Sequence, residues 1–331
     1  MIRPTPDVAA RCSLSLAICA LLSLPIVAQA APDAAPAPSA ALALERTPIH
    51  SGEADGGTPY GTWATGARYK VAFDDGATVV PYLGRTYPTN QTWCWHTVSA
   101  RVGSLELRSR PQPARTLQEY RAEYDHGAIV EAYDVLAAGL EQTFVLAARP
   151  PVTGDLVITG RTAGELRAAS RGPEHAPIVF RDAAGAAILS YGSATAIDAT
   201  GKTHAMTTAV DGEHVVLRLD GAWLADASYP VVVDPLIGVF YQTSGFDLIG
   251  DIDVMHMEGG NGRNVWFVEQ RWASAADGDL WLRRFDNDGN NSLLCFADVT
   301  TSWSSMTPSL GKHQRGGYAL LAFARHLSND L

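Results

Sequence analysis

GLEQTFVL, at residues 139–146, alternates between two kinds of side chain with a period of two. The even-numbered positions, which begin with Leu140 and include Gln142, fall on one face of an extended chain. The odd-numbered positions, which begin with Glu141, fall on the opposite face. Such alternation is typical of a strand that has one face against a core and the other toward water. The segment therefore predicts a strand of an antiparallel sheet.

Short runs of β-branched and aromatic residues continue this pattern on both sides, with Gly, Asp, Asn or Pro between them. These runs are RYKVAF (68–73), ATVVPY (77–82), TWCWHTV (92–98), VGSLELR (102–108), AIVEAYDV (128–135), GDLVITGR (154–161), PIVFRD (177–182) and AAILSYG (186–192). The one helix-like piece, residues 117–125, is too short and too aromatic for a stable helix. We therefore predict an all-β fold, with an antiparallel sandwich-like domain over residues 58–236.

The first 57 residues are predicted to lie outside this fold. An apolar stretch at residues 13–27 follows two arginines and is too short to span a bilayer comfortably, and Ala28-Gln29-Ala30 has the form that signal peptidase accepts. We expect a signal peptide over residues 1–30, cleavage near Ala30, and a secreted or cell-envelope protein. Residues 31–57 are rich in Ala and Pro and predict a disordered leader.

The charge of the chain bears on its partners. A formal net charge of −10 argues against a nucleic acid or an anionic membrane as the partner, because both bind to a basic surface. No segment after the signal peptide is long and apolar enough for a membrane helix. The partner itself is not identified by the sequence, and a glycan or a protein at the cell surface is the expectation.

AIDATGKT, at residues 196–203, fits a permissive template of the phosphate-binding loop. Such a loop leads from a buried strand into a helix N-terminus. The residues that follow Lys202 instead alternate as strands and contain Asp211-Gly212 and Asp220-Gly221, pairs that predict turns. We therefore predict a turn between two strands, with Gly201 at positive φ.

YPVVVDP, at residues 229–235, resembles the hydrophobic strand that accompanies a phosphate loop. Without that loop, Asp234 is not expected to bind magnesium. The prolines on both sides of the valines limit the segment to the edge or the end of a sheet, because proline cannot donate to the hydrogen-bond ladder. We predict that the first domain ends here.

Motifs that carry chemistry are missing or incomplete. G-x-S-x-G, H-E-x-x-H and G-x-G-x-x-G are absent, and histidines occur singly. Ser309 and Lys312 match the S-x-x-K of serine acyl-transfer enzymes, but a proline before the serine opposes the required helix. Asp234, Asp251 and Asp253 are candidate acids for a free-standing enzyme, although acidic residues at strand ends are ordinary. We assign no catalytic, cofactor-binding or metal-binding residue.

Calcium is the one cofactor hypothesis. In RFDNDGNNS, residues 284–292, Asp286, Asp288 and Asn290 alternate as the ligands of a calcium loop do. Asn291 stands where an EF-hand needs glycine, and Ala297 where it needs a bidentate glutamate. An Asp-Gly pair between two apolar runs is also a strong hairpin signal, and the hairpin is the preferred interpretation.

The cysteines and tryptophans leave alternatives open. Cys94 and Cys295, the cysteines that follow the signal peptide, could form a disulfide or be two separate thiols, and separate thiols are favoured. Tryptophans could form a platform for sugars or belong to a core, and the core is favoured. They are Trp93, Trp95, Trp266, Trp272, Trp281 and Trp303.

Four segments follow one another in a recognisable order: AYDVLAAGLEQTFVLAARP (132–150), GDLVITGR (154–161), PIVFRDAAGAAILSYGSATAIDATGK (177–202) and SYPVVVDPLI (228–237). In this order, residues 119–237 resemble an uncharacterised β domain found near the N-terminus of large secreted bacterial proteins. There it precedes β-propeller-like repeats. The resemblance implies location and architecture. The family has no established reaction, so no catalytic residue is carried over.

The segment after this domain resembles the start of such repeats. Residues 264–290 have the form of two propeller strands joined by a turn at Asp277-Gly278, and residues 316–331 resemble the beginning of a second copy. Arg271 matches Arg325 at a spacing of 54 residues. The pair Ser274 and Ser328 has the same spacing.

A closed propeller needs at least four blades of about 40 to 50 residues, and 94 residues follow Ile237. We expect residues 237–331 to form partial propeller-like repeats. Either the chain is truncated, or this sheet packs onto the first domain or onto a partner. The leading hypothesis is an exported, non-enzymatic β protein for surface display, adhesion or ligand binding. The alternative is an accessory module of an exported hydrolase that degrades polysaccharide or protein.

Overall fold

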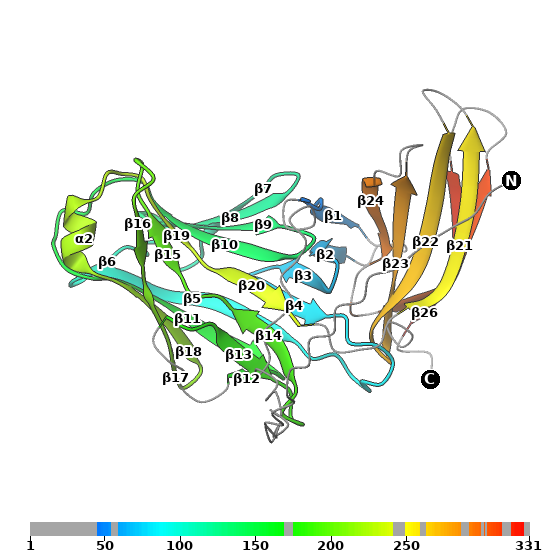
Figure 1. Ribbon diagram of the computed structural model, residues 1–331, viewed down its shortest axis with the longest axis horizontal. Helices are drawn as coiled ribbons and strands as arrows, with labels where there is room; N and C mark the ends of the chain where they lie inside the picture. Colours follow the sequence, from blue (N-terminus) through cyan, green and yellow to red (C-terminus); the bar gives the residue numbers. More distant parts are fainter. Residues whose placement is uncertain are drawn as a thin grey trace, which may run out of the picture. The chain divides into compact units, whose positions relative to one another are not determined.

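A computed structural model describes residues 45–53, 59–168, 175–240, 249–258, 263–285, 291–298, 301, 303–312 and 319–327. These residues lie mostly in β-strands that pair antiparallel in several open sheets, which confirms the all-β prediction (Figure 1). Within the described ranges, no helix has the length and hydropathy to cross a membrane. The predicted signal peptide and the first part of the leader lie outside the described residues.

The first sheet has the order β1-β2-β3-β4-β5-β11-β18-β17, and β6 pairs with β5. Consecutive strands β1 to β5 are antiparallel neighbours, so the order of the sequence becomes the order of the sheet. The strands are β1 His50–Glu53, β2 Pro59–Thr65, β3 Tyr69–Phe73, β4 Ala77–Pro81, β5 Trp93–Val102, β6 Leu105–Glu106, β11 Leu156–Gly164, β17 Thr207–Asp211 and β18 His214–Leu219.

The second sheet has the order β12-β13-β14-β20-β10-β19-β15-β16, and β7, β8 and β9 join it beside β10. The segment 139–146 is β10 and pairs with β9 on one side and with β20 and β19 on the other. The strands are β7 Ala114–Leu117, β8 Arg121–Asp125, β9 Val130–Val135, β10 Gly139–Leu146, β12 Arg167–Ala168, β13 Ile178–Arg181, β14 Ala187–Tyr191, β15 Thr195–Ile197, β16 Thr203–Ala205, β19 Val231–Asp234 and β20 Leu236–Val239.

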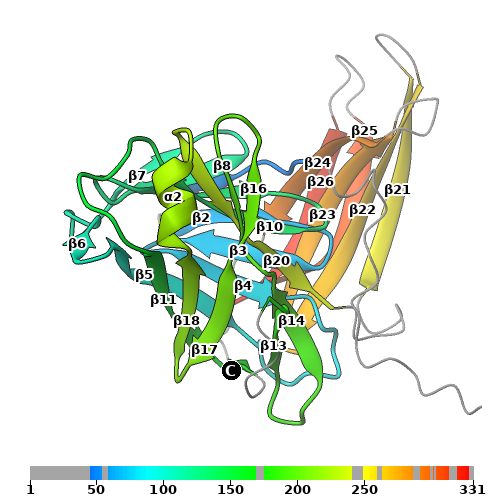
Figure 2. The same ribbon diagram turned by 60° about the vertical axis from the view of Figure 1, so that its left-hand side comes forward.

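The first two sheets lie beside each other in both views (Figures 1 and 2), and side chains of both sheets form one hydrophobic core. β10 contributes Leu140 and Phe144, and Gln142 between them is also fully buried, as the alternation predicts for a single face. Trp95 of β5 stacks on Tyr191 of β14 with the ring centroids 5.1 Å apart and the planes 7° from parallel. Aromatic burial of this kind dominates the stability of a β core.

The third sheet has the order β21-β22-β23-β24, and β25 and β26 form a separate hairpin. β25 lies against β21, β22 and β23. The side-chain amide of Gln270 donates to the backbone oxygen of Ser305 at 2.7 Å, and the carboxylate of Asp253 accepts from the backbone N–H of Leu310 at 2.7 Å. The strands are β21 Ile249–Glu258, β22 Arg263–Ser274, β23 Asp277–Phe285, β24 Asn291–Asp298, β25 Trp303–Lys312 and β26 Ala319–Leu327.

The predicted turn in AIDATGKT is confirmed. β15 and β16 pair on either side of it, and Gly201 has a φ of 83°. The carboxylate of Asp198 accepts from the side chain and backbone of Thr200 and from the backbone N–H of Lys202 and Ser228. These hydrogen bonds, above all those from Thr200 and Ser228, lower the pKa of Asp198 to about 2. The turn is held by its own aspartate rather than by a phosphate.

The prediction that YPVVVDP forms an edge or end strand is wrong. β19 lies between β10 and β15, inside the second sheet. Pro230 precedes β19 and Pro235 follows it, so neither proline removes a hydrogen bond from within the strand. After Pro235 the chain continues as β20 along the same side of β10.

Two predicted Asp-Gly turns are also wrong. Asp220-Gly221 begins a short helix, α2 Gly221–Asp226, in which the carboxylate of Asp220 caps the backbone N–H of Trp223 at 2.9 Å. The turn between β22 and β23 lies at Ala275-Ala276, two residues before the predicted position. Asp277 is therefore the first residue of β23 and its side chain is buried.

Candidate functional site

Lys70 of β3 is the most unusual residue in the interior, because its charged side chain is completely buried. Tyr69 and Val71 on either side of it belong to the core of the first two sheets, so Lys70 points to the other face of β3. The third sheet covers that face. A small hydrophobic cluster lies at the same contact. It contains Val80 of β4, Tyr82 just after β4, Ala273 of β22 and Trp281 of β23.

Two aspartates of β23 surround the ammonium group. Nζ of Lys70 lies 2.8 Å from Oδ1 of Asp277, and 3.1 and 2.9 Å from Oδ1 and Oδ2 of Asp279. Oδ2 of Asp277 accepts a hydrogen bond of 2.5 Å from Nδ2 of Asn90. We call these four residues the Lys70 centre. It joins segments that are 207 residues apart in the chain.

A second charged pair reinforces the same contact. The guanidinium of Arg271 pairs with Glu269 and lies 3.5 Å from the ring centroid of Trp281. Arg271 also donates to the backbone oxygen of Ala67, just before β3, at 2.6 Å. The indole of Trp281 donates in turn to the hydroxyl of Tyr82 at 3.3 Å. The third sheet therefore packs onto the first through buried polar contacts, which is one of the arrangements expected from the sequence.

The Lys70 centre is not balanced in charge. Burial lowers the pKa of Lys70, but the charges of Asp279 and Asp277 raise it by more, so the pKa is raised and the ammonium persists. Burial and the charge of Asp279 raise the pKa of Tyr82, which stays neutral. One ammonium beside two carboxylates leaves one excess negative charge in a medium of low dielectric constant.

Glu131 of β9 forms a second buried polar group, inside the core of the first two sheets. Its Oε1 accepts from the hydroxyl of Tyr133 at 2.5 Å and from Nε2 of Gln142 at 2.8 Å. Its Oε2 accepts from the hydroxyl of Thr97 at 2.7 Å and lies 2.9 Å from Nε2 of His126. We call these five residues the Glu131 centre. Both oxygens of its carboxylate have two partners each.

Hydrogen bonds fix the protonation state of this centre. Nε of Arg108 donates to Nδ1 of His126 at 3.2 Å, so Nδ1 is an acceptor and the imidazole proton lies on Nε2, toward Glu131. Burial raises the pKa of Glu131, but the hydrogen bonds from His126, Tyr133 and Thr97 lower it by more, and the net pKa is lowered. Glu131 is thus a buried carboxylate that accepts four hydrogen bonds, and Arg108 donates to one of its four partners, His126.

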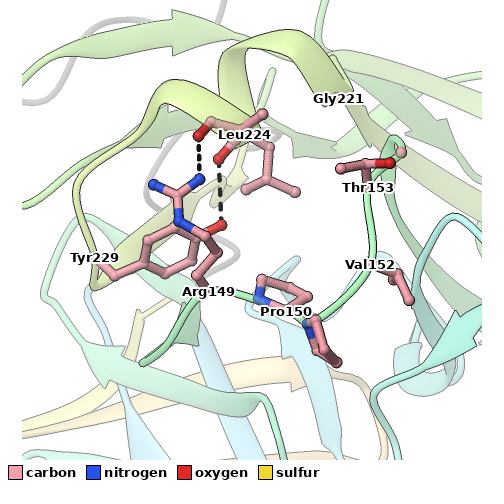
Figure 3. A pocket seen from close by; sticks show the side chains of 10 residues that line it. Arg149, Pro150, Val152, Thr153, Gly221, Leu224 and Tyr229 are labelled. Carbon is pink, nitrogen blue, oxygen red and sulfur yellow. Dashed lines mark hydrogen bonds between the residues drawn. The ribbon is translucent and has the colours of Figure 1, made fainter.

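A shallow pocket lies between α2 and the segment that follows β10 (Figure 3). Arg149 supplies its positive charge, but the guanidinium donates to the backbone oxygens of Ala225 and Ala227 and lies 5.0 Å from the ring centroid of Tyr229. The hydroxyl of Tyr229 donates to the backbone oxygen of Leu224. The polar groups of this pocket therefore hold the end of α2.

Of the candidate catalytic residues from the sequence, Asp253 and Ser309 are brought together by a side-chain hydrogen bond, whereas Asp234, Asp251 and Lys312 take no part in that contact. Ser309 and Lys312 lie in β25, where residues three positions apart face opposite sides of a strand. Asp251 and Asp253 lie in β21, whereas Asp234 lies in β19 of the second sheet. Burial raises the pKa of Asp234. Across the described ranges, no group of three or more metal-ligating side chains is placed to hold an ion.

The remaining predictions have clear outcomes where the structure describes them. Cys94 is a free thiol, and Cys295 lies in β24, where its side chain is outside the described part of the structure. The proposed calcium loop, Asp286 to Asn290, lies outside the described residues, and the strands on either side of it pair as a hairpin. The tryptophans Trp93, Trp95, Trp272 and Trp281 are buried, as the core interpretation requires.

Sequence analysis did not single out the Lys70 or Glu131 centres. One signal was available: Asp277 and Asp279 are two positions apart, so they share one face of a strand. The Asp-Gly pair at Asp277 concealed it, because that pair is a strong turn signal. Comparison of the chain with protein-family profiles, curated proteins and solved structures found no match. The residues themselves are therefore the basis for any functional conclusion.

Proposed function

We propose that the chain is an exported, non-enzymatic β protein that acts as a rigid module in surface display, adhesion or ligand binding. The observation that carries this proposal is the Lys70 centre. Its ionised groups are buried and contact each other across two sheets, so their role is to hold β3 and β23 together. A module that presents a surface outside the cell gains from such a contact, because the two parts then move as one body.

The proposed architecture is a sandwich-like domain followed by propeller-like repeats. The single core that the first two sheets share supports the sandwich-like domain. Supporting the repeats is the spacing of strands: β25 begins at Trp303 and ends at Lys312, each 54 residues after the corresponding ends of β21, Ile249 and Glu258. β21 to β24 would form one four-stranded blade, and β25 and β26 the first half of the next.

A second candidate is a non-catalytic accessory module of an exported hydrolase that degrades polysaccharide or protein. Ile252 and Val254 of β21 favour it, because their side chains are 55% and 60% exposed on a strand at the end of the third sheet. Apolar side chains on a sheet edge suit a neighbouring domain.

Cell fractionation and a binding screen test the proposal together. We expect the full-length chain, expressed with a C-terminal tag in a bacterial host, to leave the cytoplasm and to begin after Ala30. The purified mature chain should bind a glycan or a cell-envelope protein saturably and leave it chemically unchanged, with and without calcium. Retention in the cytoplasm, or conversion of a bound polysaccharide or peptide, would contradict the proposal.

A further inference from the structure

An amine and a carboxyl group face each other at the Lys70 centre, without access to water. We propose that Lys70 and Asp279 condense to an intramolecular amide that links β3 to β23, and that Asp277 is the acid–base group of this reaction. The modification site is thus the pair Lys70 and Asp279. This inference concerns the covalent state of the chain and does not depend on export or on a ligand.

The first requirement is that the reacting groups are held together. Nζ of Lys70 lies 2.9 and 3.1 Å from the two oxygens of Asp279, so the amine is positioned in front of the carboxyl group as a whole. Both side chains are 0% exposed. Groups fixed at such distances react as if at very high concentration, with effective molarities of about 10⁵ M or more in well-oriented cases.

The second requirement is a group that moves protons, and Asp277 meets it. Its Oδ1 lies 2.8 Å from Nζ, while its Oδ2 is held by the side-chain amide of Asn90. Two donors keep this carboxylate oriented beside the amine. Both oxygens of Asp279 lie within 3.1 Å of Nζ, whereas Asp277 places one oxygen there and the other at Asn90; the side chain of Asp279 also hydrogen-bonds with Tyr82. These differences assign Asp279 as the electrophile and Asp277 as the base.

The third requirement is that Asp279 reacts as a carboxylic acid, so that its hydroxyl leaves as water. With one proton taken up, the centre contains the ammonium of Lys70, the carboxylate of Asp277 and the carboxylic acid of Asp279. Asp277 accepts a proton from Nζ, and the nitrogen lone pair attacks Cγ of Asp279. A second Nζ proton passes through Asp277 to the departing hydroxyl. The products are the amide, one water and protonated Asp277, and no oxidant or reductant is needed.

The surroundings favour the product. Three buried charges cost free energy even when they are paired, and the amide replaces an ammonium and a carboxyl group with a neutral bond. Aromatic rings surround the site: the ring centroid of Trp63 lies 5.9 Å from Nζ, and Tyr82 packs edge-on against Trp281 of β23. Since neither Lys70 nor Asp279 is exposed, the water that leaves does not readily return to reverse the reaction.

Mass spectrometry of the purified mature chain tests the proposal. We expect an intact mass lower by one water than the sequence predicts from the measured N-terminus. After trypsin, the chain should remain uncut after Lys70, and one branched peptide should join the segment with Lys70 to the segment with Asp279. An unmodified mass would overturn the proposal. So would a succinimide at Asp277-Gly278, which loses the same water but leaves trypsin able to cut after Lys70.

Variants separate the roles of the groups. Lys70→Arg and Asp279→Ala should both restore the full mass, and Asp277→Ala should leave at least tenfold less of the cross-linked form. Lys202→Arg, at an exposed lysine, is the matched control and should keep the loss of water. A branch that fragmentation assigns to Asp277 would overturn the assigned electrophile. Circular dichroism identifies the folded variants, and folded Lys70→Arg that still lacks one water would also overturn the proposal.

Discussion

The Lys70 centre and the Glu131 centre bury charge in two different ways. The carboxylate of Glu131 has four hydrogen-bond partners within the first two sheets and their connections, and Arg108 donates to one of these partners, His126. The ammonium of Lys70 instead has two carboxylates, both from a segment more than 200 residues away. One centre is complete within the first two sheets, whereas the other is complete only when the third sheet is in place.

The two centres therefore contribute differently to the stability of the fold. A fully satisfied carboxylate in a core selects one arrangement of the strands around it, because every alternative leaves donors unpaired. The buried charges of the Lys70 centre lie between two sheets, so the contact between these sheets depends on charge. We therefore expect changes at Glu131 to affect the first two sheets as a whole. Changes at Lys70 should affect the third sheet first.

The largest effect is expected for Glu131→Ala. Removal of the carboxylate leaves the donors of Thr97, His126 and Gln142 without their acceptor inside the core. Loss of one partner from a buried charged network costs about 3 to 5 kcal/mol of unfolding free energy. Urea denaturation at neutral pH measures the loss. Glu123→Ala on β8 is the control, because Glu123 is partly exposed and pairs with Arg121 near the surface, where pairs contribute about 1 kcal/mol or less.

The pH dependence of this difference gives a second check. The pKa of Glu131 is lowered by its hydrogen bonds, so its stabilisation is fully present above the unfolded value of about 4.3 and is lost as the pH falls toward the folded value. The gap in unfolding free energy between the wild type and Glu131→Ala should therefore narrow on acidification. A gap that widens as the pH falls would mean that Glu131 is protonated in the folded state.

Lys70→Met should produce the next largest effect, in a different place. The variant leaves Asp277 and Asp279 as two buried carboxylates without their cation, at a cost of about 3 kcal/mol. Hydrogen exchange should become faster in β22 and β23 while β10 keeps its protection, because the core of the first two sheets lies on the other face of β3. Equal loss of protection in β10 would show that the two centres form one cooperative unit.

The sequence predicts the strands better than it predicts the centres. Alternation identifies β10 and places Gln142 on its core face, because the period of a strand is local information. Nothing local shows that Glu131 will face Gln142, since that depends on the pairing of strands. Lys70 lies on the polar side of an alternating strand and would be expected in water. It is buried because a sheet from the far end of the chain covers it. The Asp-Gly pair at Asp277 predicts a turn, so the sequence does not place Asp277 in the strand where the structure has it.

Gly160→Ala should cause a moderate effect that is confined to the Glu131 centre. A Cβ at Gly160 of β11 would lie between 2.1 and 2.4 Å from ring atoms of Trp95, whose indole donates to Thr97. Overpacking of a filled core costs about 1 to 3 kcal/mol, and urea denaturation measures it. The matched control is Gly238→Ala in β20, where the nearest atom would be the hydroxyl of Ser190 at 3.2 Å. Similar losses for both variants would argue against a tightly packed Trp95.

The smallest effect is expected for a matched pair of tyrosine variants. Tyr191→Phe removes the hydroxyl that donates to Oε1 of Gln142 at 2.7 Å, and leaves a buried acceptor unpaired at a cost of about 1 to 2 kcal/mol. Tyr82→Phe removes the hydroxyl that Trp281 and Thr65 contact at 3.3 Å and that also hydrogen-bonds with the side chain of Asp279. The hydrogen bonds of this hydroxyl with Trp281 and Thr65 are longer than the one that Tyr191 donates, so we expect their loss to cost about 1 kcal/mol or less. We expect the faster hydrogen exchange that reports this loss to occur in β23. A larger loss of unfolding free energy for Tyr82→Phe than for Tyr191→Phe would contradict this order.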